Sequence, residues 1–224
     1  MSRVRLPPVY AFFRVFFHIL LRLFFRFRVV GIEKVPATGG CLLASNHASF
    51  LDPPALGGAI PFRLVHFMAR RTLMKPWGLR WVMPRLEIIP VDRVGGDVSA
   101  LKAALRRLRE GRMVALFPEG TRSIDGSLLP PRGGIGFLIA KAGVPVVPVY
   151  IGGSFQAWPR RRRFPRLHPI TVTFGSPIQP EEIAAQGTDR GSFERLAERV
   201  MQRIAELKGS DGSPANPGKT GGLE

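Results

Sequence analysis

Residues 45–53 read Ser45-Asn46-His47-Ala48-Ser49-Phe50-Leu51-Asp52-Pro53 and follow the apolar run Cys41-Leu42-Leu43-Ala44. The apolar run predicts a buried strand that ends where the polar residues begin. The imidazole of His47 and the carboxylate of Asp52 are therefore expected where a strand ends and the chain turns. A histidine with a carboxylate behind it is a general base, because the carboxylate fixes the imidazole tautomer and stabilises the imidazolium.

The spacing of this pair places a condition on the backbone. On a straight helix five residues rotate by about 500°, so His47 and Asp52 would point about 140° apart. The two side chains meet only if the chain turns between them. Pro53 and Pro54 favour such a turn followed by a helix, because proline keeps the preceding residue out of the α region and suits a first helical turn. Taken alone, the pair would also fit a strand-end histidine and a helix-capping aspartate without catalytic work.

The sequence offers this base no nucleophile of its own. No Gly-x-Ser-x-Gly elbow is present, and the one cysteine, Cys41, lies inside the apolar run. The base is therefore expected to activate a hydroxyl that arrives with the substrate.

A second polar stretch, Phe117 to Ser123, follows another apolar run at Met113-Val114-Ala115-Leu116. It again places polar groups at the end of a strand, where open α/β sheets bind ligands. Together the two stretches resemble the glycerophospholipid acyltransferase family, most closely its 1-acylglycerol-3-phosphate acyltransferases. Four blocks in the family's order, covering about residues 30–180, carry the resemblance: Asn46-His47 to Asp52, Ile88-Ile89-Pro90-Val91-Asp92-Arg93, Phe117-Pro118-Glu119-Gly120-Thr121-Arg122-Ser123 and Val144-Pro145-Val146-Val147-Pro148-Val149.

The resemblance implies a reaction. An acyl group would move from acyl-CoA or acyl carrier protein to the free hydroxyl of a lysophospholipid, above all 1-acylglycerol-3-phosphate, to give phosphatidic acid. His47 would remove the hydroxyl proton while Asp52 stabilises the imidazolium, and no acyl-enzyme is required. The thioester is a co-substrate, and neither another cofactor nor a metal is implied, since the four histidines show no ligand spacing.

The resemblance also implies an acceptor site. Its residues are Arg93, Glu119, Gly120, Thr121 and Arg122, with both arginines on the phosphate. Arginine suits this task because its planar fork gives two parallel charge-assisted hydrogen bonds. An anionic Glu119 would be repelled by phosphate, so it is expected to accept from a glycerol hydroxyl or to orient an arginine.

One departure from the family leaves the acceptor open. Family members often carry Phe-Lys-x-Gly after the third block, whereas this chain has Pro130-Pro131-Arg132-Gly133, which keeps a cation but no aromatic ring. Lysophosphatidylethanolamine, lyso-ornithine lipid and glycolipid acceptors stay open as alternatives. A lipid hydrolase could use the same base to activate water, and water exclusion decides between the two reactions.

The charge of the 224-residue chain points to a polyanion. It has 33 Lys and Arg against 16 Asp and Glu, a formal net charge of +17. Both nucleic acid and an anionic membrane surface fit such a balance. The apolar N-terminus and the four blocks favour the membrane, so no nucleic-acid partner is expected. A single cysteine allows no internal disulfide and fits a reducing compartment.

The segment Val9–Val30 predicts an apolar helix, running to about Arg28, in which basic residues recur every four positions at Arg14, His18, Arg22 and Arg26. Spanning a bilayer is possible by length, but an arginine at mid-span costs roughly 2.5–3.5 kcal/mol. A basic stripe on an aromatic helix suits the membrane plane, with Arg14, Arg22 and Arg26 at headgroups. Docking on the domain's own core is the remaining alternative. We expect a monotopic or peripheral protein on the cytoplasmic face, with a second headgroup contact at Arg160–Arg163.

Strands alternating with helices predict an α/β fold with a mixed, largely parallel central sheet. The expected organisation is a membrane-associated segment at 1–30, one flanked-sheet domain at 31–208 and a disordered Gly-, Ser- and Pro-rich tail at 209–224. His66 is read as structural. The aromatic stretch 77–83 fits either a membrane or acyl contact or plain core. The expected strands are 31–36, 41–44, 64–68, 86–91, 113–117, 144–151 and 170–174, and the clearest helices are 54–60, 97–109, 133–142 and 192–208.

Overall fold

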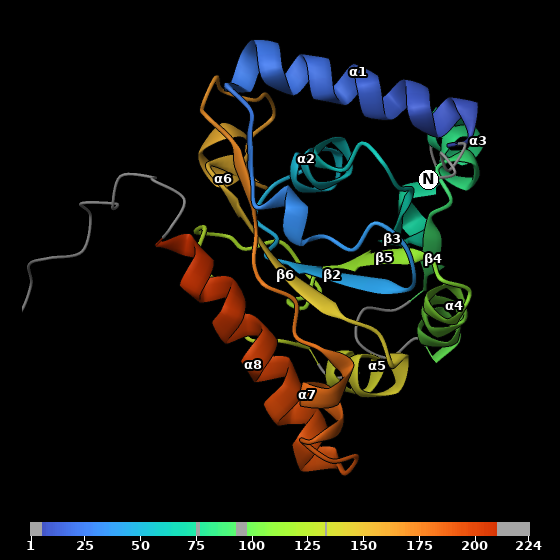
Figure 1. Ribbon diagram of the computed structural model, residues 1–224. Coiled ribbons are helices and arrows are strands. Elements are labelled where there is room, and N and C mark those ends of the chain that lie inside the picture. Colours follow the sequence, from blue (N-terminus) through green and yellow to red (C-terminus); the bar gives the residue numbers. More distant parts are fainter. Residues whose placement is uncertain (1–5, 75–76, 93–97, 133, 210–224) are drawn as a thin grey trace, which may run out of the picture.

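The computed structural model describes residues 6–74, 77–92, 98–132 and 134–209, and within them a seven-stranded sheet runs through the centre of the molecule (Figure 1). The strand order is β1-β7-β6-β2-β5-β3-β4. The strands are β1 (Arg28–Val30), β2 (Cys41–Ser45), β3 (Val65–Arg70), β4 (Ile89–Val91), β5 (Met113–Leu116), β6 (Val146–Gly152) and β7 (Thr171–Phe174).

The sheet is mixed and largely parallel, as predicted. Only the β6–β7 pair is antiparallel among the described pairs, so β1 and β7 run against the other strands. Every residue of β2, β5 and β6 is buried, which is what strands covered on both faces require. Ala44 of β2 pairs with Leu116 of β5, so these two central strands end side by side.

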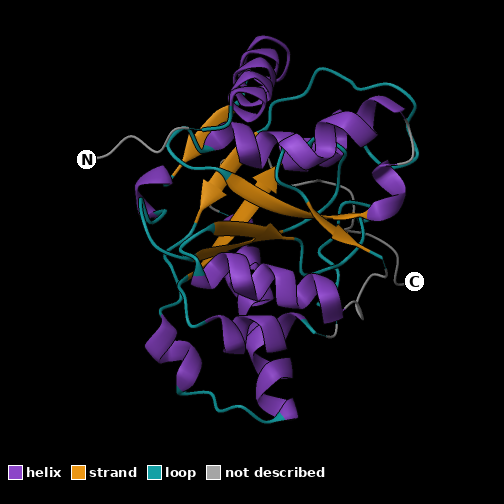
Figure 2. Cartoon of the chain, turned by 90° about the vertical axis from the view of Figure 1, so that its right-hand side faces the viewer, coloured by secondary structure: helices purple, strands orange, loops and turns teal. Residues whose placement is uncertain are grey.

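Helices cover both faces of the sheet (Figures 1 and 2). On one face, α1 (Pro8–Phe25) lies over α2 (Asp52–Ala59), and α3 (Trp77–Arg85) lies at one end of α1. On the other face lie α4 (Val98–Arg109), α5 (Ile135–Ala142) and α8 (Arg190–Lys208). Two short helices, α6 (Ser154–Ala157) and α7 (Pro180–Ala184), complete the set, with 3-10 turns at Ile32–Lys34 and Arg71–Met74.

The core is divided into two clusters by the sheet. Leu43 of β2 faces the α1 and α2 side, where it shares a cluster with Leu21 and Leu56. Leu42 faces the other side, where it shares a cluster with Leu108 of α4 and Val200 of α8. Alternate residues of one strand therefore hold both layers in place, and α8 packs on the sheet as its amphipathic pattern predicts.

Two strands differ in position from the prediction, in each case because a residue has a left-handed backbone conformation. The strand expected at 31–36 is instead β1 at 28–30, because Gly31 has φ of 74° and ends the strand before a 3-10 turn. The strand expected at 86–91 begins only at Ile89, because Glu87 has φ of 57°. Neither backbone conformation is compatible with an extended strand.

The N-terminal helix ends earlier than predicted, and its basic residues differ in exposure. Arg26 is left-handed at φ 43°, so α1 ends at Phe25, and Arg28 lies in the sheet. A four-residue spacing advances about 40° around the helix at each step. The basic stripe therefore winds around α1: His18 Nδ1 lies 3.0 Å from the Gly58 carbonyl oxygen of α2, and Arg14 Nε is buried, whereas Arg22 is exposed. Arg14 as a whole is half-buried, so its contact with headgroups stays a prediction.

His66 is structural, as expected from its place inside β3. It is buried, and its Nδ1 lies 3.1 Å from the carbonyl oxygen of Glu87. Burial lowers the pKa of its imidazole, so the ring stays neutral. Of the tail expected at 209–224, residues 210–224 lie outside the described residues.

Candidate active site

His47 and Asp52 meet at the C-terminal end of β2. The Nδ1 of His47 lies 2.8 Å from Oδ2 of Asp52, whose side chain is fully buried, while the imidazole keeps 17% of its surface exposed. The chain turns between them and enters α2 at Asp52, with Pro53 and Pro54 in the first helical turn. The carboxylate accepts the Nδ1 proton, so Nε2 of the ring is left as the basic nitrogen for a substrate.

The same carboxylate oxygen also holds the backbone of the turn. The N–H groups of Ala48 and Ser49 donate to Asp52 Oδ2 at 2.7 Å each. Three donors thus converge on one oxygen that no water reaches. Asp52 therefore fixes both the tautomer of His47 and the path of the loop that carries it.

The stretch after β5 fixes His47 from the neighbouring strand end. The backbone N–H of His47 donates to Glu119 Oε1 at 3.0 Å, and its carbonyl oxygen accepts from the Ser123 N–H at 2.8 Å. Gly120, at φ 63°, donates to the Phe117 carbonyl oxygen at 2.9 Å and closes the turn that places Glu119. The first and third sequence blocks thus form one rigid unit around the imidazole.

Glu119 lies beneath the catalytic loop. It is 1% exposed, and its Oε2 is buried without a hydrogen-bond partner. Burial raises the pKa of its carboxyl group to about 7, although hydrogen bonds from the His47 and Leu129 backbones act to lower that pKa. Within the described ranges it pairs with no arginine. Glu119 accepts from the backbone of His47 and from that of Leu129, a positioning role that the sequence patterns did not indicate.

The third side of the loop is held by β6 and the segment after it. The Asn46 amide pairs twice with the backbone of Ile151, at 3.1 and 2.7 Å. Ser49 Oγ donates to the Trp158 carbonyl oxygen at 2.7 Å. The arginine run that begins at Arg160 is therefore attached next to the catalytic loop, although it is more than 100 residues away in sequence.

Two aromatic rings contact functional side chains of the site: Phe117 packs on His47, and Phe50 packs on Arg122. The Phe117 ring stacks on His47 with centroids 4.0 Å apart and planes 17° apart. The Arg122 guanidinium lies 3.5 Å from the centroid of Phe50, and one of its terminal nitrogens is buried without a partner. Burial and the nearby charge of Arg160 lower the pKa of Arg122. Such a cation would gain from a bound anion, because an anion would satisfy the unpaired N–H group.

The other residues predicted to bind the acceptor differ in burial, and one of them lies outside the described residues. Gly120 and Thr121 lie in the turn between Glu119 and Arg122 and are half-buried. Arg93 lies outside the described residues, so its place beside Arg122 stays a prediction. Arg132 is exposed, and its backbone N–H donates to the Pro118 carbonyl oxygen at 2.8 Å.

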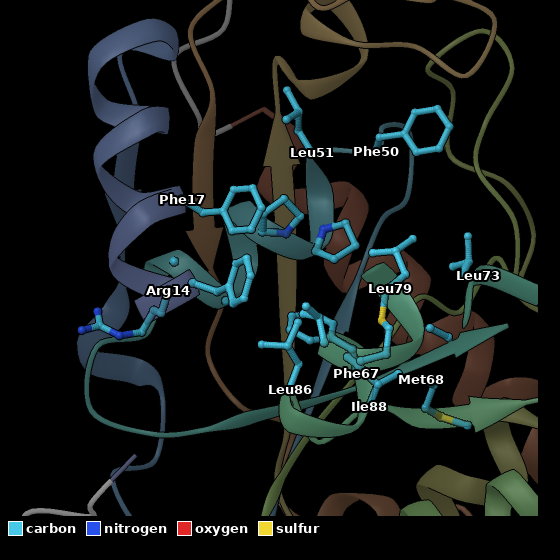
Figure 3. A pocket seen from close by; sticks show the side chains of 18 of the residues that line it. Arg14, Phe17, Phe50, Leu51, Phe67, Met68, Leu73, Leu79, Leu86 and Ile88 are labelled. Carbon is cyan, nitrogen blue, oxygen red and sulfur yellow. The ribbon is translucent and has the colours of Figure 1, made fainter. Parts of the chain in front are cut away.

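An apolar cavity of about 500 Å³ opens at His47 (Figure 3). Phe17 of α1 lies on one side and Leu79 and Leu86 on the α3 side, with Phe67 and Ile88 at the sheet. The imidazole, Phe50 and Arg122 line the same space. The site therefore combines a base, a cation and an apolar chamber, and the part of the chain that the structure describes holds no cluster of three or more acidic, histidine or cysteine side chains suited to a metal ion.

Several of these functional neighbours have no signal in the sequence patterns. Phe117 and Glu119 belong to a recognised block, but nothing in the block says that one stacks on His47 and the other binds its backbone. Trp158 could have been suggested only by its place beside a basic run. The stretch 77–83 was left open between acyl contact and core, and three of its side chains line the cavity.

Comparisons with known proteins agree with this geometry. The family model described as Acyltransferase matches residues 26–152. The 1-acyl-sn-glycerol-3-phosphate acyltransferase of Bacillus subtilis is 30% identical over 81% of this chain and 87% of its own length. A chloroplastic 1-acyl-sn-glycerol-3-phosphate acyltransferase of Brassica napus is 32% identical over 61% of this chain, and the match spans only 40% of that longer relative.

A solved structure shares the fold. The 1-acyl-sn-glycerophosphate acyltransferase PlsC from Thermotoga maritima superposes with a TM-score of 0.74 at 27% sequence identity, covering 89% of this chain and 79% of that one. The family match includes His47, Asp52 and Glu119, so all three residues lie inside the shared region. The chain belongs to the acyltransferase family.

Proposed function

We propose that this enzyme transfers an acyl group from a thioester, either acyl-CoA or acyl carrier protein, to the free hydroxyl of 1-acylglycerol-3-phosphate. The observation that carries the proposal is the His47 Nδ1–Asp52 contact at 2.8 Å beside an apolar cavity. It supplies a base with a fixed tautomer at a chamber that suits an acyl chain. The names of the bacterial, plant and thermophilic relatives support the same acceptor.

The geometry supports a direct transfer. Nε2 of His47 takes the proton of the acceptor hydroxyl as that oxygen attacks the thioester carbonyl carbon. The carbon–sulfur bond then breaks, and the imidazolium returns the proton to the departing thiolate. Asp52 stabilises the imidazolium between the two transfers. The chain needs no nucleophile of its own. Cys41 does not offer one, because its thiol is buried and burial raises the pKa of that thiol to about 12.

The Arg122 guanidinium, which lines the cavity, supports a phosphate-bearing acceptor. Arg122 lies beside His47 with an unpaired buried nitrogen, and Arg93 follows β4 in the second block. The apolar lining of the cavity also supports transfer over hydrolysis, since a bound acyl chain would exclude water from the thioester.

Membrane association is part of the proposal, because acceptor and product are membrane lipids. Within the described ranges, α1 is long and apolar enough to cross a bilayer by length and composition. It lies along α2 instead, with Leu21 and Phe25 buried and Phe12, Phe16 and Leu23 exposed. We propose a monotopic enzyme on the cytoplasmic face, with the exposed apolar residues of α1 in the membrane and Arg160–Arg163 at headgroups.

The experiment that tests the acceptor is a competition among lysolipids. The purified full-length protein is incubated with an isotope-labelled acyl donor and equal amounts of 1-acylglycerol-3-phosphate, lysophosphatidylethanolamine, lyso-ornithine lipid and lysoglycolipid. Mass spectrometry then reports which diacyl product carries the label. We expect phosphatidic acid to dominate. A different dominant product would replace the proposed acceptor, and labelled free fatty acid as the main product would show a hydrolase.

A further inference from the structure

The helix α3 presents apolar side chains on two opposite sides. With about 100° of rotation per residue, Leu79, Val82 and Met83 lie on one side and Trp77 and Trp81 on the other. A helix that packs on a core normally has one apolar side. The second apolar side of α3 therefore needs its own explanation.

The inner side of α3 lines the cavity beside His47. Leu79, Val82 and Met83 line it, as does Leu86 just after the helix. Figure 3 shows Leu79 and Leu86 across the cavity from Phe17 of α1. None of the nine residues of α3 is buried, so this helix is a thin wall between the cavity and the outside.

The outer side of α3 exposes two large rings. Trp77 is 89% exposed and Trp81 is 54% exposed. The Arg85 guanidinium lies 3.9 Å from the centroid of the Trp81 ring, and Arg80 is exposed beside them. Tryptophan side chains gather where a hydrocarbon layer meets water, because one end of the indole is apolar and the other carries an N–H donor. Arginine in the same place meets anionic headgroups.

This surface continues onto α1. The two helices are in contact, and Figure 1 shows α3 at the N-terminal end of α1. Phe12 and Phe16, on the part of α1 closest to that end, are also exposed. Both helices thus expose aromatic rings near the place where they meet, and residues of both line one cavity.

We propose that the outer side of α3, with Trp77 and Trp81 at its centre, rests in the interface of an anionic bilayer. The inference rests on the membrane association proposed above and adds a second element to it. Its consequence is that a single helix separates the apolar cavity from the hydrocarbon of the membrane. An acyl chain can then pass between bilayer and cavity along α3 without crossing water. The arginines beside the tryptophans favour an anionic lipid surface over an apolar protein groove as the occupant.

Tryptophan quenching tests the contact in the full-length protein. The chain contains three tryptophans, and Trp158→Phe leaves the two of α3 as the only emitters. The variant is mixed with vesicles of phosphatidylglycerol and phosphatidylcholine whose acyl chains are brominated near the headgroup. We expect bound protein to lose at least about half of its emission, because bromine quenches indole only at contact depth in the interface. The reciprocal variant, Trp77→Phe with Trp81→Phe, reports Trp158, which packs against Phe50 and should be quenched less.

An activity measurement tests the consequence independently. Trp77→Ser with Trp81→Ser should lower the rate on an acceptor embedded in vesicles by about tenfold, because two interfacial rings are lost. The rate on a short-chain acceptor dispersed as monomers should stay within about twofold. Val98→Ser, which removes an exposed apolar side chain from α4, is the matched control and should change neither rate.

The outcomes separate this inference from the proposed function. Vesicle binding without quenching of Trp77 and Trp81 would overturn the α3 contact and leave the role of α1 intact. Unchanged vesicle activity in the doubly substituted chain would overturn it as well. Absence of vesicle binding by the unaltered protein would overturn both the α3 contact and the proposed membrane association, while activity on the monomeric acceptor would still report the acyl transfer.

Discussion

The guanidinium of Arg122 packs against the aromatic ring of Phe50. Its guanidinium lies 3.5 Å from the centroid of the Phe50 ring, and a terminal nitrogen is buried without a partner. Lysine would keep the charge but lose the broad guanidinium contact with the Phe50 ring and the two-pronged hydrogen bonding to phosphate. Arg122→Lys should therefore weaken use of the acceptor by about tenfold or more and largely spare the thioester donor.

Steady-state kinetics with each substrate varied in turn separate the two effects. Arg203→Lys, on the exposed side of α8, serves as the control and should change neither constant. A rise in the apparent KM of the donor with an unchanged acceptor KM would contradict the assignment of Arg122.

Glu119 makes the stability of the protein depend on pH in a definite direction. Its pKa is raised from 4.5 to about 7, so between these values the folded state binds a proton that the unfolded state has released. The free energy of unfolding should then fall as pH rises through this window, with a slope of up to about 1.4 kcal/mol per pH unit, and stay level above it. Glu119→Gln should remove this slope.

Urea unfolding at a series of pH values measures the effect. Glu181→Gln, on the short helix α7, is the matched control, since it changes the same side chain at an exposed site. Parallel stability curves for Glu119→Gln and the unaltered chain would contradict a raised pKa at Glu119.

The close packing of α5 against α8 requires glycine at position 136. A Cβ on Gly136 of α5 would lie 1.7 Å from the Phe193 carbonyl oxygen of α8, and a backbone oxygen cannot move aside as a flexible side chain can. Gly136→Ala should therefore separate α5 from α8 and lower the free energy of unfolding by more than about 3 kcal/mol. Gly78→Ala in α3, where an added Cβ meets nothing within 4 Å, should be neutral or stabilise by up to about 1 kcal/mol. Chemical unfolding of both variants decides, and an unaffected Gly136→Ala would contradict the packing of these helices.

The elements that sequence predicted well are those whose pattern has a local cause. The continuous apolar runs of β2, β5 and β6 follow directly from burial on both faces, and α4 and α8 follow from three- and four-residue spacing. The errors lie where one residue leaves the usual backbone region: Gly31, Arg26 and Glu87 are all left-handed. Glycine permits that conformation without requiring it, and for arginine or glutamate no sequence pattern predicts it.

The site was predictable in its chemistry and only partly in its contacts. The His47–Asp52 pair could be proposed because its spacing demands a turn and two prolines provide one. The hydrogen bonds of Glu119 and Ser123 to the backbone of His47 depend on β2 and β5 ending side by side. That arrangement is a property of the sheet. The contact of Ser49 with Trp158 joins residues that lie far apart in the sequence, and no single-sequence pattern reports such a pair.

At the scale of the whole molecule, α1 belongs to the domain as well as to its surface. Leu21, Phe25 and Phe27 are buried, so deleting the first 28 residues would open the core and would not isolate a membrane effect. Substituting the exposed face avoids this difficulty. Phe12→Ser with Leu23→Ser should leave the melting temperature nearly unchanged and weaken vesicle binding by at least about tenfold, because apolar burial in the bilayer is lost.

Vesicle sedimentation at low and high salt measures this effect. Salt should weaken binding of the unaltered chain without abolishing it, since screening acts on the arginines and not on apolar contacts. Val98→Ser again provides the control. Unchanged sedimentation of the doubly substituted chain would contradict the membrane role of α1.

Replacing His47 tests whether its imidazole is the base of a direct transfer. The initial rate of labelled phosphatidic acid formation is compared between the unaltered enzyme and His47→Ala, with matching melting temperatures as proof of folding. We expect a loss of at least about a thousandfold, because the proton acceptor is lost and no nucleophile of the chain replaces it. Comparable rates in the two proteins would contradict it.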